Sequence, residues 1–179
     1  MRFTGQEIRE ITISAVVIGF IFAWHFAGGV PGIGQITMAL TGVGFAFIFH
    51  EMAHKYMAQK YGCWAEYRMW DTGLIIAFFS VIVFGIVFAA PGAVYIRPGI
   101  RGITKKENGI ISVSGAVANL VLAVIFYFIG FQFGVIINAW LALFNMIPFP
   151  PLDGSKVRAW DTKVWIGVIL CALVLMEIA

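Results

Sequence analysis

Long apolar runs separated by short polar segments dominate the pattern of this chain. A helix needs about 20 predominantly apolar residues to cross a bilayer. Five runs approach or exceed that length, and we predict transmembrane helices at 11–27, 36–61, 108–131, 135–149 and 164–178. The last two runs are rather short for a full crossing. The pattern therefore predicts an all-α polytopic membrane protein with about five transmembrane helices.

The apolar segment 74–90 is harder to assign. Arg68 precedes it, and four basic residues follow it: Arg97, Arg101, Lys105 and Lys106. Basic residues favour the cytoplasmic side of a membrane, so both ends of the segment are predicted on that side. We therefore favour a re-entrant or membrane-embedded hairpin over 74–96. The alternative is a sixth transmembrane helix, which would reverse the orientation of everything after it.

The composition supports a membrane protein. The 179 residues are 61% hydrophobic and only 12% charged, whereas soluble domains carry about 25% charged residues. There is no long soluble stretch, so we predict a single membrane-embedded domain over 1–179, with a core at 36–154 and no appended soluble domain. The net charge is +3, and the basic residues lie beside the apolar runs. This placement is typical of membrane topology and argues against a nucleic-acid partner. The N-terminus is predicted in the cytoplasm.

A cluster of polar residues, His50-Glu51-Met52-Ala53-His54, ends the second apolar run. Two histidines four positions apart lie on one face of a helix, where they can bind the same metal ion. Glu51 can accept a proton from an attacking water and deliver it to a leaving amine. The short H-E-x-x-H pattern also occurs by chance, so its interpretation depends on a third ligand.

Catalytic zinc usually has three protein ligands. The only other histidine, His25, is predicted about 21 Å from the cytoplasmic start of its helix, whereas His50 is predicted about 9 Å from the cytoplasmic edge. Asp153 fits better, because three prolines break the preceding helix and Gly154 permits a tight turn. The weaker candidates lie beside hydrophilic or flanking residues: Glu66, Asp71 and Asp161. The metal site is therefore predicted in the cytoplasmic half of the membrane.

The two polar clusters together resemble a known family. H-E-x-x-H is followed, 99 residues after His54, by the aspartate of N-x-x-P-x-x-x-x-D-G. This combination is similar to the site-2 protease family of intramembrane zinc metalloproteases, over residues 36–154. The resemblance implies one Zn²⁺ ion held by His50, His54 and Asp153, with Glu51 as general base and acid. It also implies that Asn145 contacts the substrate or shapes the site.

A third family element departs from the pattern. The family has G-P-x-x-N, but Ala116 stands at the proline position between Gly115 and Asn119. The resemblance implies that Asn119 polarises a substrate carbonyl or holds the substrate strand. An interhelical hydrogen bond is an equally good interpretation of Asn119. We predict that Gly115 and its small neighbours form a close helix-packing face.

The predicted function is an intramembrane zinc endopeptidase whose partners are a transmembrane protein substrate and the lipid bilayer. A multi-span metal-ion transporter is the alternative, because ionisable residues inside spans also build ion pathways. A transporter would be expected to place polar residues along a continuous path, whereas here they cluster in the predicted cytoplasmic half. An inactive relative that binds membrane proteins ranks last, because every zinc and base position is intact. The sequence does not indicate the oligomeric state.

Overall fold

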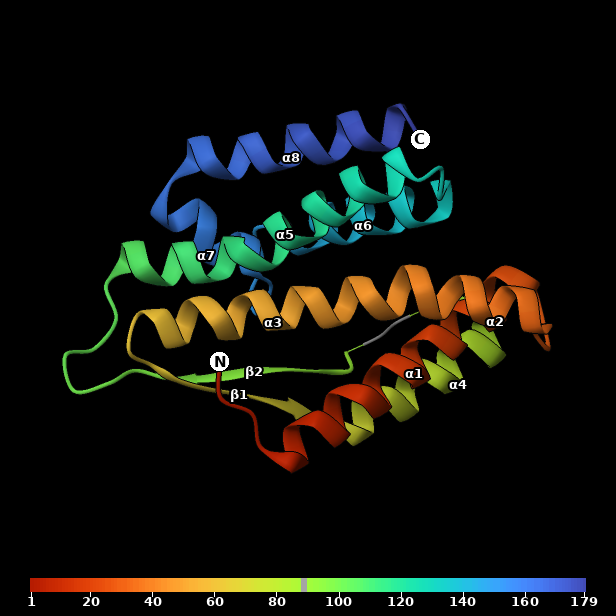
Figure 1. The fold of residues 1–179 in the computed structure, drawn as a ribbon, viewed down its shortest axis with the longest axis horizontal. Helices are drawn as coiled ribbons and strands as arrows, with labels where there is room; N and C mark the ends of the chain where they lie inside the picture. The colour runs from red at the N-terminus through yellow and green to blue at the C-terminus, as the bar shows by residue number, and fades with distance from the viewer. Residues whose placement is uncertain (88–89) are drawn as a thin grey trace. The chain divides into compact units, whose positions relative to one another are not determined.

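The computed structural model describes residues 1–87 and 90–179 and is shown in Figure 1. The chain forms two compact units. The first contains Phe49–Ala65 and Ile96–Ala179 together with Met1, and the second contains Arg2–Ile48 and Glu66–Tyr95. All residues predicted to form the metal site belong to the first unit.

The described part of the chain is mainly helical. Its elements are α1 (Gly5–Ala27), α2 (Ile33–Ala39), the π-helical turn η1 (Leu40–Gly44), α3 (Phe45–Lys60), β1 (Trp64–Met69), α4 (Asp71–Phe84), β2 (Gly92–Arg97), α5 (Lys105–Phe128), α6 (Gln132–Asn145), α7 (Asp153–Trp160) and α8 (Thr162–Glu177). The five predicted helices are present, with ends shifted by a few residues. The short sheet of β1 and β2 shows that the fold is not wholly α-helical.

Three helical segments are long and apolar enough to cross a membrane: Gly5–Ala27, Ile33–Lys60 and Lys105–Phe128. Two shorter helices, α4 and α6, are also apolar. Ile33–Lys60 is one helix that passes from α2 through η1 into α3. These segments are consistent with a membrane protein, and the predicted total of five crossings remains a prediction.

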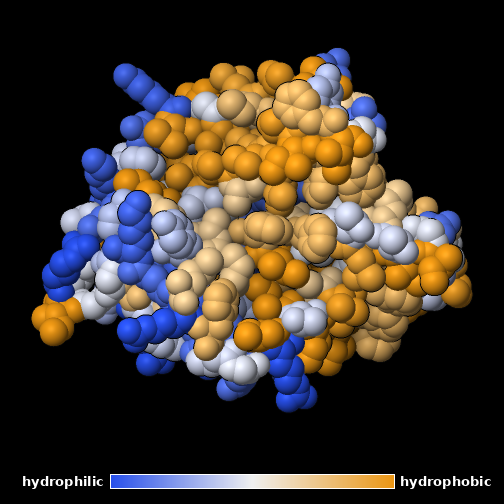
Figure 2. Space-filling model, in the orientation of Figure 1, coloured by the Kyte–Doolittle hydropathy of each residue, from blue (hydrophilic) through white to orange (hydrophobic). Residues whose placement is uncertain are grey.

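Exposed apolar side chains support the same conclusion. Figure 2 shows hydrophobic residues over much of the visible face. On α4, Phe79 is 59% exposed and Phe84 is 74% exposed, and on α5 Phe128 is 80% exposed. Soluble proteins rarely expose apolar patches of this extent. These faces therefore fit a lipid environment.

In the first unit, α5, α6, α7 and α8 pack around one apolar core. Its buried members are Val113, Ala116, Ala142, Met146, Val157, Val168 and Ala172. α5 begins with a capping box, in which the side chains of Thr104 and Glu107 each bond the other's backbone N–H. This cap satisfies amide groups that the first turn of a helix leaves without partners. The start of the helix that faces the metal site is thereby fixed.

The loop between α6 and α7 is held against this core. The indole Nε1 of Trp165 on α8 donates to the carbonyl of Met146, 2.7 Å away. Met146 itself is 1% exposed. As the sequence predicts, the helix α6 ends before the prolines, which separate it from α7. The structure also shows that the Pro150–Pro151 bond is cis. The loop thus delivers Asp153 to the start of α7.

In the second unit, acidic residues of α1 hold β1. The carboxylate of Glu7 accepts a hydrogen bond from the backbone N–H of Tyr67, at 2.9 Å, and Glu10 accepts one from Met69, at 3.0 Å. Glu7 is completely buried. The acidic residues near the N-terminus therefore have a structural role, because they hold the backbone of β1.

The structure shows that most of the segment 74–96, predicted as a re-entrant or membrane-embedded hairpin, is helical, while its re-entrant path stays a prediction. Its first part is the helix α4, which ends at Phe84 and is capped by Gly85 in the left-handed region, with a φ of 67°, and only its last part is the strand β2. A helix satisfies its own backbone groups in an apolar environment, which outweighs the β-branched composition of this segment. Positions 88 and 89 lie outside the described residues.

The two ends of this segment nevertheless meet. The backbone N–H of Trp70, just before α4, donates to the carbonyl of Pro91, just before β2, at 3.0 Å. The chain therefore returns after α4 to the place from which it departed.

Candidate metal centre

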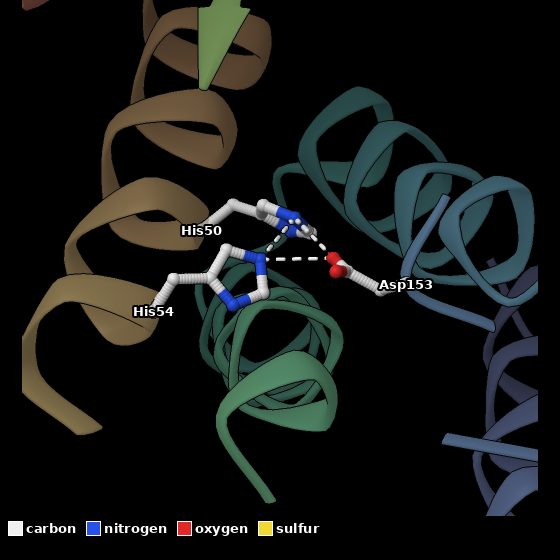
Figure 3. A group of neighbouring side chains, drawn as sticks. All are labelled: His50, His54 and Asp153. Atoms are coloured by element: carbon white, nitrogen blue, oxygen red, sulfur yellow. Dashed lines mark hydrogen bonds and ion pairs between the residues drawn. The ribbon is translucent and has the colours of Figure 1, made fainter. Parts of the chain in front are cut away.

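Three side chains predicted to bind zinc converge in the first unit (Figure 3). His50 and His54 lie one turn apart on α3, and Asp153 is the first residue of α7. The Nε2 atoms of the two histidines are 3.0 Å apart. Oδ2 of Asp153 lies 2.9 Å from Nε2 of His54 and 3.6 Å from Nε2 of His50. Residues separated by about a hundred positions in sequence thus present three donor atoms to one point.

The donor set fits zinc. Bonds of about 2.0–2.1 Å at tetrahedral angles place neighbouring ligand atoms roughly 3.3 Å apart, close to the distances between these three atoms. Two imidazoles and one carboxylate also leave a fourth position open, as catalytic zinc sites do. Among the described residues, His50, His54 and Asp153 form the group that could hold a metal ion. Both histidines are buried, each only 7% exposed.

Hydrogen bonds from α5 orient the two imidazoles. Nδ1 of His54 lies 2.8 Å from the backbone carbonyl of Ile111. Nδ1 of His50 lies 2.7 Å from Oδ1 of Asn119. Because each Nδ1 faces an acceptor, each Nε2 is directed to the metal position. The helix α5 therefore aligns the ligands that α3 carries.

Asp153 is held as a charged ligand. Burial opposes its charge, but His54 and His50 outweigh that effect and hold the pKa of its carboxyl well below the ordinary value. The ammonium group of Lys156, one turn along α7, lies 3.2 Å from Oδ1. The start of a helix also favours a negative charge. One carboxylate oxygen thus faces Lys156 while the other faces the histidines.

Gly154 allows α7 to approach the preceding loop. A Cβ atom at this position would overlap the carbonyl groups of Met146 and Ile147. We expect Gly154→Ala to displace Asp153 and to lower zinc affinity at least tenfold, the loss typical of a disturbed ligand environment. Zinc affinity is measured by competition with a chelator. The matched control is Gly5→Ala at the start of α1, where a Cβ meets nothing within 4 Å; equal affinities in both variants would contradict the expectation.

The remaining predicted site residues lie in different surroundings. Glu51 follows His50 on α3 and is 8% exposed. Asn145 ends α6, where its Nδ2 donates to the carbonyl of Leu141 at 2.9 Å. Asn119 is completely buried and contacts His50 directly. The structure thus shows the interhelical bond that is one of the two interpretations of Asn119, and its partner is His50, a predicted zinc ligand.

His25 lies in the second unit, on α1. Its Nδ1 is 2.9 Å from the carbonyl of Gly85, the residue that caps α4. This hydrogen bond joins His25 to the end of α4. His25 is absent from the metal-binding group found among the described residues, in agreement with its predicted depth in α1.

Two residues near the centre were not identified from the sequence. The sequence predicts that Gly115 serves helix packing, but a Cβ there would lie 2.5 Å from Nε2 of His54 and 2.7 Å from Nε2 of His50. Asn138 on α6 was not singled out, although its Oδ1 accepts a bond from Nδ2 of Asn119 at 3.1 Å. The signal for Asn138 was present, because a polar residue inside an apolar helix is costly unless it has a partner.

Comparison with known proteins identifies relatives that are named for this chemistry. The chain is 43% identical, over 178 residues, to a protein of Methanocaldococcus jannaschii named "Putative zinc metalloprotease MJ0611"; the match covers 92% of this chain and 89% of the relative. It is 26% identical over 144 residues to "Putative zinc metalloprotease YwhC" of Bacillus subtilis, covering 63% of each protein. No family model and no solved structure gives a significant match.

These names favour a protease over the metal transporter that the sequence left as an alternative. They also agree with the donor atoms of His50, His54 and Asp153, which fit zinc. With 43% identity over nearly its whole length, the chain belongs to the zinc metalloprotease family of these relatives.

Proposed function

We propose that this zinc metalloprotease is of the site-2 type and cleaves transmembrane segments within or near the bilayer. The observation that carries the proposal is the position of the ligands. His50 and His54 belong to the segment Ile33–Lys60, which is long and apolar enough to cross a membrane. Ionisable residues inside such segments are rare and usually functional.

The position of His50 along the segment Ile33–Lys60 indicates the depth of the zinc site in the membrane. At about 1.5 Å per residue, His50 lies roughly 15 Å from Lys60, the basic end of the segment, and roughly 25 Å from Ile33. This puts the ligand away from both ends and nearer the basic one. Since basic residues favour the cytoplasmic side, we infer a zinc site in the cytoplasmic half of the bilayer, with a cytoplasmic N-terminus.

Bound zinc supplies a Lewis acid that polarises the scissile carbonyl and makes water a stronger nucleophile near neutral pH. Glu51, buried beside His50, accepts the proton of the attacking water and returns it to the departing amine. Asp153 and the two imidazoles remain ligands throughout. Asn145, at the end of α6 next to the loop that delivers Asp153, is proposed to contact the substrate backbone.

A transmembrane substrate poses a problem that soluble peptides do not. Its amide groups are bonded within its own helix, because an apolar environment offers no alternative partners. The substrate helix must therefore unwind locally before its carbonyl reaches the zinc. We expect substrates with glycine or proline near the cleaved bond to be preferred, since these residues destabilise a helix.

The proposal is tested by mapping cleavage in vesicles. The protein is reconstituted with a single-span substrate, and the products are identified by mass spectrometry. We expect a cut inside the span, in its cytoplasmic half, that is abolished by a zinc chelator and restored by added zinc. A matched substrate whose span is replaced by a soluble sequence should be cleaved at least tenfold more slowly. Cuts confined to the soluble flanks would contradict the intramembrane assignment while leaving a zinc protease in place.

A further inference from the structure

We propose that Asn138 is a positioning residue for the zinc ligand His50 and acts on it through Asn119. Three hydrogen bonds connect them in a row. Nδ2 of Asn138 donates to the carbonyl of Gly134 at 2.9 Å, Oδ1 of Asn138 accepts from Asn119 at 3.1 Å, and Oδ1 of Asn119 lies 2.7 Å from Nδ1 of His50. Both asparagines are completely buried.

The direction of this row is fixed at its far end. The carbonyl of Gly134 can only accept a hydrogen bond, so Asn138 must turn its NH₂ group to it and its oxygen to Asn119. Asn119 must then offer its NH₂ group to Asn138 and its oxygen to His50. An oxygen that faces Nδ1 requires a proton there. The imidazole therefore keeps its proton on Nδ1 and leaves the lone pair of Nε2 for zinc.

His54 reaches the same state in a simpler way. Its Nδ1 faces a backbone carbonyl directly, that of Ile111, and such an oxygen cannot turn to present a donor. An asparagine can rotate by 180° and exchange its oxygen for its nitrogen. The bond to Asn138 therefore favours the orientation of Asn119 that turns its oxygen to His50, whereas the carbonyl of Ile111 needs no such support.

Loss of Asn138 has a specific consequence. Without Asn138, the buried NH₂ group of Asn119 loses one acceptor, and the orientation that turns its oxygen to His50 becomes less favourable. A rotated Asn119 presents a donor to Nδ1 of His50, and the imidazole then favours the tautomer with its proton on Nε2. That proton competes with zinc for the same nitrogen. This inference concerns zinc binding alone and does not depend on where the substrate is cleaved.

The test combines zinc affinity with the tautomer of His50. We expect Asn138→Ala to lower zinc affinity about tenfold, the lower end of the effect of partners that orient metal ligands. ¹⁵N NMR of labelled histidine in the zinc-loaded protein should show a slowly exchanging Nδ1 proton on His50 in wild type, and faster exchange in the variant. The His54 signals should not change.

Two further variants separate positioning from general destabilisation. Val135→Ala removes a buried side chain from the same helix without touching the three bonds, and it should leave zinc affinity unchanged. Asn119→Asp places an acceptor beside His50 in either orientation, so adding Asn138→Ala to it should change zinc affinity less than twofold. Wild-type affinity and Nδ1 exchange in Asn138→Ala, or equal losses in Val135→Ala, would overturn the proposal.

Discussion

Replacing Glu51 by glutamine is expected to lower the rate of peptide hydrolysis by a factor of about 10²–10⁴, the contribution typical of a general acid–base, while zinc stays bound. Glutamine has nearly the same shape as glutamate, so the buried position beside His50 can remain filled. Its neutral amide cannot accept the proton of the attacking water. The rate is measured on a reconstituted substrate, and the metal content by elemental analysis.

The control for this variant is Glu177→Gln at the exposed end of α8, which makes the same chemical change away from the centre. It should leave both rate and zinc content at the wild-type level. Cleavage by Glu51→Gln at the wild-type rate would remove Glu51 from the mechanism and require another base. Loss of zinc together with loss of activity would instead show that Glu51 maintains the site.

The sequence predicts that His50, His54 and Asp153 lie together, as the structure shows, because the constraints on these residues are local. Helical periodicity alone places His50 and His54 on one face. Asp153 follows from a second local signal, the prolines that end α6 and the glycine after the aspartate. Neither signal depends on how far apart the segments lie in sequence. In the structure, one ligand atom from each of the three residues lies within 4.8 Å of the other two.

The surroundings of the ligands could not be predicted in the same way. Whether Asn119 faces His50 or a substrate depends on the rotation of α5 about its axis relative to α3, which no local pattern specifies. The same holds for Asn138, which meets Asn119 only because α5 and α6 pack with this register. Helix packing in apolar surroundings is set by side-chain fit over the whole contact, and a single sequence does not reveal that fit.

The secondary structure of the segment after β1 differs from the predicted hairpin for another physical reason. Residues 71–84 are rich in β-branched and aromatic side chains, which favour strands on a half-buried surface. In apolar surroundings the need to satisfy backbone groups decides instead, and an isolated segment can satisfy them only as a helix. The charge pattern predicts both ends of the segment on one side of the membrane, and that topology stays a prediction; the bond between Trp70 and Pro91 shows only that the two ends lie close together.

Replacing Gly115 by alanine is expected to lower zinc affinity at least a hundredfold, the upper end of the losses seen when the support of a metal ligand is removed. Its Cβ would lie 2.5 Å from Nε2 of His54 and 2.7 Å from Nε2 of His50. Ordinary contacts between carbon and other heavy atoms are about 3.5–4.0 Å. The methyl group would therefore push apart the two nitrogens that bind zinc, or occupy the space beside them.

The helix itself gives no reason for glycine at this position. Alanine in a helix interior is about 1 kcal/mol more favourable than glycine, so the loss of zinc affinity in Gly115→Ala would arise from the contact with the imidazoles and not from a weaker α5. Gly167→Ala in α8 is the matched control, because a Cβ there meets nothing within 4 Å. Thermal unfolding without zinc and zinc affinity are measured for both. Zinc binding by Gly115→Ala at the affinity of Gly167→Ala would show that the imidazoles can move aside, and that α5 only packs against the centre without limiting it.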